Sequence, residues 1–178
     1  MLTRDTILTA LRLLSDELGR CGVLGEISVV EGTAMVLAFN ARSATKDVDA
    51  IFEPSSEVRK AASVVAEHLG LPVVWLNDAA KGFLSSAGEF APIDTLDLPN
   101  LRVLAPTAEY MLAMKVMAAR TGISGERGDV QDIVFLIRLL GLKKAGDVMD
   151  VVQRYYDPSK ILPRSFYLVD EILEDAKF

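Results

Sequence analysis

Hydrophobic and polar positions alternate along this chain with two periods, one typical of amphipathic helices and one typical of strands. The helical period predicts a first helix that is capped by Thr3 and runs to about Leu18. It is followed by a predicted strand over 27–30, an apolar helix over 33–41 and a second strand that ends at Phe52. Because the helix over 33–41 is apolar almost all round, we expect it to be buried.

The rest of the chain adds several helices and few strands. Strands are predicted over 71–76 and 101–105, and a loop over 85–100 leads into the second of them. Helices are predicted over 55–68, 77–84 (a single turn), 106–120, from 129 onward, 143–156 and 161–176. These elements indicate an α/β (α+β) fold in a single domain, 1–178, with a sheet-containing core over about 1–105 and a helical part over about 106–178.

The composition is that of an ordinary globular protein, with 51% hydrophobic and 25% charged residues. The longest apolar runs are interrupted by Lys or Arg, so we expect no membrane-spanning segment. The first residues, Met1–Asp5, lead into an amphipathic helix rather than a signal peptide, and the single cysteine, Cys21, allows no internal disulfide. We therefore expect a cytoplasmic protein in which Cys21 is a buried filler.

The net charge of −6 argues against a protein that coats DNA or RNA in general. Two residues that could carry chemistry have simpler structural interpretations. His68 is expected to be a cation or surface residue at a helix end, and Trp75 to be part of the core. Lys81 is a weak candidate for a phosphate contact.

Two carboxylates one residue apart are the most informative feature of the sequence. In a strand, Asp47 and Asp49 lie on the same side, while Val48 between them points into the core. Such a pair suits Mg²⁺, which prefers a few carboxylates together with substrate phosphates. The turn at Gly32 and Thr33 opens a helix and would let backbone N–H groups approach a triphosphate. The pattern favours metal-dependent phosphoryl or nucleotidyl transfer, although a solvated pair on an edge strand has the same spacing.

Four segments, in order, resemble the nucleotidyltransferase superfamily, specifically the small bacterial family related to AbiEii-type toxins. The resembling segments are 32–49, which holds Gly-Thr and Asp-x-Asp, then 75–84, 110–115 and 127–133. Together the resemblance spans about Glu26 to Gly141, which is most of the chain. It implies a nucleotidyltransferase-like fold, with a small mixed β-sheet flanked by helices and a helical C-terminal half.

The resemblance also implies the residues of the site. Asp47 and Asp49 would be catalytic and would hold Mg²⁺ or Mn²⁺, and Lys115 would contact the triphosphate of a nucleoside triphosphate substrate. Asp129 and Asp132 share one helix face, and one of them would belong to the active site, orienting Lys115 or the acceptor hydroxyl. The residues that would bind the nucleotide are Gly32, Thr33, Arg42, Lys46 and Lys115.

Three of these side chains keep an alternative interpretation when the residues are considered alone. Arg42 and Lys46 are equally well explained as solvated cations at a helix end. Lys115 lies in an apolar run, and its long side chain could snorkel to the surface.

The activity that the resemblance implies is transfer of a nucleoside monophosphate from the triphosphate to an acceptor hydroxyl, on an RNA end or a protein. Relatives of this kind often act as the toxin of a toxin–antitoxin pair, so an antitoxin protein is implied as a partner.

The sequence departs from the family in two places. Glu31 stands where members usually have glycine, and the strand over 101–105 lacks the third carboxylate that many members carry there. The nearest acids, Asp94 and Asp97, precede that strand. These departures motivate the alternative function, a nucleotide-binding or regulatory module that keeps the fold but has lost efficient transfer.

Overall fold

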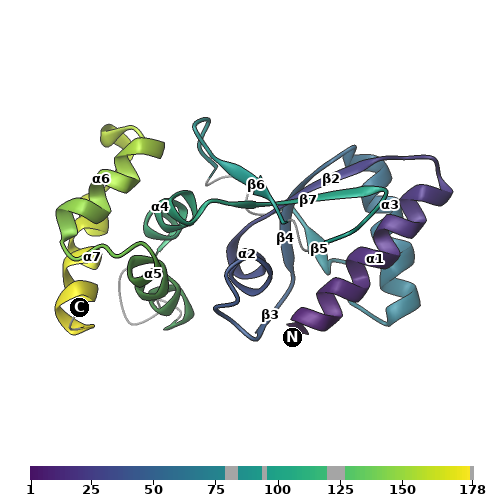
Figure 1. Ribbon diagram of the computed structural model, residues 1–178, viewed down its shortest axis with the longest axis horizontal. Helices are drawn as coiled ribbons and strands as arrows, with labels where there is room; N and C mark the ends of the chain where they lie inside the picture. Colours follow the sequence, from purple (N-terminus) through teal and green to yellow (C-terminus); the bar gives the residue numbers. More distant parts are fainter. Residues whose placement is uncertain (79–83, 94–95, 120–126, 177–178) are drawn as a thin grey trace. The chain divides into compact units, whose positions relative to one another are not determined.

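A computed structural model describes residues 1–78, 84–93, 96–119 and 127–176 (Figure 1). Within these residues the protein is a mixed α/β structure with seven α-helices, a five-stranded mixed sheet and a two-stranded sheet. The chain divides into two compact units, 1–82 with 90–105 and 83–89 with 106–178. We call them the sheet unit and the helical unit. Residues 83–89 precede the last strands of the sheet unit in sequence but belong to the helical unit.

The sheet unit is built on five strands in the order β5, β4, β2, β7, β6. Their bounds are Leu76–Asn77 for β5, Val48–Glu53 for β4, Gly25–Val29 for β2, Leu101–Pro106 for β7 and Phe90–Pro92 for β6. Strand β2 runs antiparallel to β4 and parallel to β7, and β4 runs parallel to β5. The predicted strand over 101–105 is confirmed, whereas β6 lies inside the predicted loop over 85–100.

One face of this sheet is buried along its three central strands. Every second residue of these strands points to it, namely Ile27, Val29, Val48, Ala50, Phe52, Leu101, Val103 and Ala105. Helices α1 (Arg4–Arg20) and α3 (Ser55–Leu69) pack on this face. The contact is close, because a Cβ placed on Gly25 would lie 2.8 Å from the Leu18 side chain and 3.6 Å from that of Val58.

The opposite face of the same strands, which we call the polar face, is partly exposed. Its side chains are Glu26, Ser28, Asp49, Ile51, Glu53, Arg102 and Leu104, and each of them is at least partly accessible to solvent. The register places Glu26 opposite Glu53 on one side and opposite Arg102 on the other. Asp49 therefore lies on the polar face, as the alternation of the sequence predicts.

Helix α1 begins as predicted, because the Thr3 hydroxyl accepts a hydrogen bond from the Thr6 N–H at 3.2 Å. The helix ends at Arg20, and Cys21 forms its C-cap. Cys21 is exposed, so the prediction of a buried cysteine is wrong. The reason is positional: the buried stripe of α1 ends at Leu18, and the residues beyond it turn into solvent.

Helix α2 (Glu31–Leu37) is shorter than the predicted 33–41, but the prediction that it is buried is confirmed from Gly32 to Leu37. The Arg4 guanidinium donates to the carbonyls of Val36 and Leu37 at 2.8 and 2.7 Å. These bonds satisfy carbonyls that a helix end leaves unpaired, so they help to end α2 at this point. The chain then forms β3 (Ala44–Thr45), which pairs with β1 (Leu2–Thr3) in a small second sheet.

Helix α3 ends at Gly70, whose φ of 63° is the left-handed conformation that glycine adopts easily. The segment after it does not form the predicted strand over 71–76, since β5 begins only at Leu76. Val73 and Val74 instead lie in solvent, with exposed fractions of 74% and 68%. Trp75 is buried, and its indole N–H donates to the carbonyl of Ala62 at 2.9 Å, so its predicted place in the core is confirmed.

The helical unit contains α4 (Ala108–Ala118), α5 (Arg127–Leu139), α6 (Ala145–Tyr155) and α7 (Pro163–Asp175). Helix α4 packs against the other three and is buried from Tyr110 to Val116. Its predicted cap is confirmed, because the Thr107 hydroxyl accepts from the Tyr110 N–H at 3.3 Å. Although α4 is strongly apolar, no helix in the described part of the chain is both long and apolar enough to span a bilayer.

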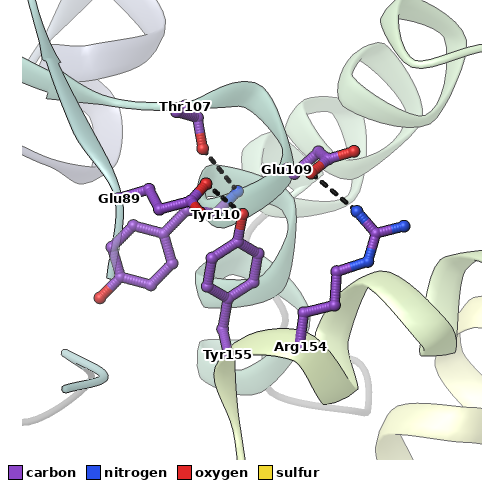
Figure 2. A network of polar contacts seen from close by, with 6 residues as sticks. All are labelled: Glu89, Thr107, Glu109, Tyr110, Arg154 and Tyr155. Carbon is purple, nitrogen blue, oxygen red and sulfur yellow. Dashed lines mark hydrogen bonds and ion pairs between the residues drawn. The ribbon is translucent and has the colours of Figure 1, made fainter. Parts of the chain in front are cut away.

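Two tyrosines hold the described residues 84–89 within the helical unit (Figure 2). The Tyr155 hydroxyl donates to Glu89 Oε2 at 2.8 Å, as Figure 2 shows. The Ser85 N–H donates to the Tyr110 hydroxyl at 2.9 Å. The centroids of the two tyrosine rings are 5.0 Å apart. Burial raises the pKa of both phenols, and the hydrogen bond to Glu89 raises the pKa of Tyr155 further.

Candidate functional site

The Asp-x-Asp segment stands where β4 begins. Asp47 immediately precedes the strand, and Asp49 lies in it, paired with Asn77 of β5. Val48 between them is completely buried, while both carboxylates are partly exposed. The two aspartates therefore lie on the accessible side of the chain, as the sequence predicts.

Two hydrogen bonds attach this segment to the beginning of α2. The Thr33 hydroxyl donates to the backbone carbonyl of Asp47 at 3.1 Å, and the Val30 N–H donates to that of Asp49 at 2.9 Å. Thr33 is completely buried, so its hydroxyl holds the backbone of Asp47 rather than facing solvent. The first turn of α2 and the Asp pair are thus fixed relative to each other.

Gly32 is in close contact with the neighbouring strand. A Cβ at this position would lie 2.5 Å from Thr45 Oγ1. Any residue other than glycine would therefore have to displace Thr45. The same point lies 3.7 Å from the Arg42 guanidinium, so this cation stands beside the turn. Lys46, the other predicted cation, is exposed. The structure thus attaches the turn of Gly32 and Thr33 to the Asp pair and places Arg42 beside Gly32.

Glu31 has a left-handed backbone, with φ of 50°. For a residue with a Cβ this conformation is costly, and glycine adopts it most easily. The position where the resembling family has glycine thus keeps a glycine-like backbone while carrying a partly exposed carboxylate. Such strain is often found near functional sites.

Lys115 forms the centre of a second cluster, within the helical unit. Its ammonium lies 2.9 Å from Asp129 Oδ1 and 3.2 Å from Asp132 Oδ2, which joins α4 to α5. Lys115 and Asp132 are only 3% and 2% exposed, whereas Asp129 is 38% exposed. The interpretation that Lys115 snorkels to the surface is therefore wrong, because two carboxylates compensate for its burial.

The predicted site residues thus form two groups, each within one unit. Asp47 and Asp49 belong to the sheet unit together with Gly32, Thr33, Arg42 and Lys46, and Lys115 belongs to the helical unit together with Asp129 and Asp132. That both groups act on one nucleotide stays a prediction.

The Asp pair fits a particular kind of metal site. No group of three or more His, Cys, Asp or Glu side chains in the described ranges could hold a metal ion by itself. Strand β7 carries no carboxylate, Asp97 is exposed in the preceding loop, and Asp94 is outside the described residues. Two carboxylates suit Mg²⁺ or Mn²⁺ when the remaining ligands come from substrate phosphates and water. The donor set is therefore compatible with a metal bound together with its substrate.

Two further residues, His68 and Lys81, were considered as candidates in the sequence. His68 is exposed in the last turn of α3, which confirms its interpretation as a surface residue at a helix end. Lys81, together with most of the helical turn predicted over 77–84, lies outside the described residues.

Sequence reasoning missed the contacts that fix these groups. Arg4 donates to carbonyls more than thirty residues away, and Asn77 stands opposite Asp49 from a strand of two residues. Neither has a local pattern that would indicate it. The four carboxylates, by contrast, carry the spacing signals from which they were inferred, and Lys115 was inferred from the resemblance.

Comparison with protein-family models, with curated proteins and with solved structures finds no match to this chain. The functional interpretation therefore rests on the motifs and on the geometry described above.

Proposed function

We propose that this protein is a metal-dependent nucleotidyltransferase with a nucleotidyltransferase-like fold, similar to the family related to AbiEii-type toxins. It would move a nucleoside monophosphate from a nucleoside triphosphate to an acceptor hydroxyl, and an antitoxin protein would be its partner. One observation carries the proposal: the Thr33 hydroxyl and the Val30 N–H hold the carbonyls of Asp47 and Asp49. A glycine-containing turn is thereby fixed beside two carboxylates, an arrangement that supports a site for a metal-bound triphosphate.

The sheet unit would supply the metal and phosphate contacts. Asp47 and Asp49 would hold Mg²⁺ or Mn²⁺, which when bound neutralises phosphate charge and polarises the α-phosphorus. Gly32 lets the first turn of α2 lie directly against Thr45, and Arg42 beside that turn would add positive charge. Lys46, being exposed, would contribute to attraction more than to precise positioning.

The helical unit would supply Lys115. The resemblance gives this lysine a phosphate-binding role, and a preorganised cation stabilises the charge that develops in the transition state. Asp129 and Asp132 would hold the ammonium in one orientation, since both lie within 3.2 Å of it. Asp132 is the better fixed of the two because it is almost completely buried.

A second candidate function follows from Glu31. Its carboxylate belongs to the first turn of α2, and a negative charge there opposes a triphosphate by roughly 1–4 kcal/mol at effective dielectric constants of about 80 to 20. The protein would then be a nucleotide-binding or regulatory module with little transfer activity.

Thermal unfolding with each common nucleoside triphosphate, with and without Mg²⁺, tests the proposal. A ligand at about 100 times its dissociation constant stabilises the protein by about 2.7 kcal/mol. We expect a metal-dependent rise in Tm that is lost in Asp47→Asn/Asp49→Asn. The matched control is Asp147→Asn/Asp150→Asn, which removes two exposed carboxylates from α6 and should keep the shift.

The second readout is release of pyrophosphate in the presence of RNA or protein acceptors. Release that requires Asp47 and Asp49 supports the transferase. A nucleotide-dependent shift without release supports the binding module. If no nucleotide changes the Tm, both candidate functions are contradicted.

A further inference from the structure

A groove lies at the end of the sheet where β2 and β7 begin and β4 ends. Its volume is about 930 Å³. Apolar residues make up much of its lining, among them Leu24, Pro54, Ile93, Leu96 and Leu98. Among the described residues, its charged lining consists of three carboxylates, Glu26, Glu53 and Asp97, and one cation, Arg102. The groove therefore combines apolar walls with a net negative charge.

The carboxylates of the groove are only partly compensated. Glu26 Oε2 lies 3.4 Å from the Arg102 guanidinium, and Glu53 Oε2 accepts a hydrogen bond from the Ser55 N–H at 3.2 Å. Glu26 and Glu53 nevertheless stand directly opposite each other on paired strands. Like charges in that arrangement destabilise a sheet, and a bound cation would relieve the repulsion.

The groove and the Asp pair lie along the same strand. Asp49 and Glu53 both belong to the polar face of β4, four residues apart, which corresponds to about 13 Å. To reach the Asp pair, a ligand in the groove would extend along the polar face past Ile51, which is partly accessible. Four residues of an extended polypeptide span that length.

We propose, on the basis of the nucleotidyltransferase function above, that the acceptor is a polypeptide whose basic and apolar side chains dock in this groove. Its lysine or arginine side chains would meet Glu26, Glu53 and Asp97, and its apolar side chains the walls of the groove. An RNA acceptor would bring phosphates against the same three carboxylates, which opposes binding. Charge complementarity thus selects a protein hydroxyl over an RNA hydroxyl.

The transfer step on such an acceptor is balanced. The oxygen of a Ser, Thr or Tyr hydroxyl forms a bond to the α-phosphorus, and the bond from that phosphorus to the bridging oxygen breaks. Pyrophosphate leaves with the electron pair, and the hydroxyl proton passes to water.

Binding of a fluorescein-labelled peptide of lysine, leucine and serine to the full chain, without nucleotide, tests the docking. Single-stranded RNA with the same label is the competing probe. We expect the peptide to bind better than RNA, and Glu26→Gln/Glu53→Gln to weaken it roughly fivefold, since exposed ion pairs contribute little each. Asp97→Asn provides a second groove variant. The control Asp147→Asn/Asp150→Asn removes two negative charges, as the Glu26→Gln/Glu53→Gln variant does, but outside the groove.

With nucleotide and Mg²⁺ added, transfer to the peptide should show a raised KM and an unchanged kcat in the groove variants. The inference is overturned if both groove variants bind the peptide as tightly as the wild type does, or if the peptide does not bind at all. It is also overturned if nucleotide is transferred to RNA in preference to the peptide. Transfer to RNA would still support the proposed function. If the peptide binds in the groove and no nucleotide binds at all, the nucleotidyltransferase function fails, and with it the acceptor role of the groove.

Discussion

The ammonium of Lys115 lies 3.2 Å from the carboxylate of Asp132, and both side chains are almost completely buried. Two charges in such a place are stable only together, because an unpaired buried charge is expensive. The pair joins α4 to α5 and makes the position of the lysine independent of any ligand.

Removing one member of this pair should therefore be costly. We expect Lys115→Met to lower the free energy of unfolding by about 3–5 kcal/mol, because it leaves the Asp132 carboxylate buried without its cation. The double variant Lys115→Met/Asp132→Leu should recover most of the loss. Arg154→Ala is the control, since it breaks the exposed pair with Glu109 and should cost about 1 kcal/mol or less. Urea denaturation measures all three, and equal losses for Lys115→Met and Arg154→Ala would contradict the argument.

The Thr33 hydroxyl should matter for ligand binding more than for stability. Thr33→Val removes the bond to the Asp47 carbonyl and should cost about 1 kcal/mol of unfolding free energy. Thr33→Ser loses one methyl group and should cost about as much. Only the valine variant should weaken the metal-dependent nucleotide shift, because only it releases the backbone of Asp47. The same nucleotide affinity in both variants, measured by titration, would mean that Thr33 is purely structural.

Glu31→Gly should stabilise the protein. The left-handed backbone costs a residue with a Cβ roughly 1–3 kcal/mol, part of which is offset by the greater freedom of glycine when unfolded. We expect a net gain of about 1 kcal/mol in chemical denaturation and tighter nucleotide binding. Asn40→Gly is the matched control, because Asn40 has φ of 51° but asparagine tolerates this region. A loss of stability in Glu31→Gly would show that its side-chain contacts outweigh the strain.

Gly88 should tolerate no side chain. A Cβ there would lie 2.6 Å from the ring and hydroxyl of Tyr110, so Gly88→Ala should destabilise the helical unit by about 1–3 kcal/mol. Gly146→Ala makes the same chemical change within α6, with no atom within 4 Å of the new Cβ. Since alanine is the better helix former, that variant should gain up to about 1 kcal/mol. Opposite signs in thermal unfolding are the expected result, and matching signs would contradict it.

The two buried tyrosines should make the protein sensitive to alkali. Their pKa values are raised because burial favours the neutral phenol in the folded state. The contribution of the neutral phenols to the free energy of unfolding is complete below the pKa of an unfolded tyrosine, about 10. It is lost as the pH rises through the higher pKa values of the folded protein. Tyr155→Phe should make the fall above about pH 10 shallower. Tyr167→Phe, at a position 73% exposed, is the control and should leave the profile unchanged.

The sequence predicts those parts of the fold that depend on neighbouring residues. Thr3 and Thr107 cap their helices, Gly70 ends α3, and the alternation around Val48 gives the correct accessible side for Asp49. The pairing of β1 with β3 was missed because strands of two residues have no periodicity. The burial of Cys21 was predicted from residue type alone, whereas its place after the last turn of α1 decides its exposure.

The candidate site follows the same division. Its acids are visible in the sequence as spacing and Lys115 through the resemblance, but the contacts that hold these side chains are not visible there. The burial of Lys115 depends on carboxylates contributed by another helix, and the hydroxyl of Thr33 is used by a carbonyl fourteen residues away. Such contacts depend on the tertiary fold, and a single sequence contains no local signal for them.

The segment before β6 is synthesised well before the helices of the helical unit that hold it. Glu89 is made 66 residues before the tyrosine that donates to it. At translation rates of about 5–20 residues per second, the ribosome delivers Tyr155 roughly 3–13 s later. Strands β6 and β7 and the Tyr110 partner of Ser85 are made early in that interval, while Glu89 lacks its own partner until the end of it. The helical unit is thus the last part of the nascent chain that can complete its folding. A polypeptide released early would lack the helices that hold this segment.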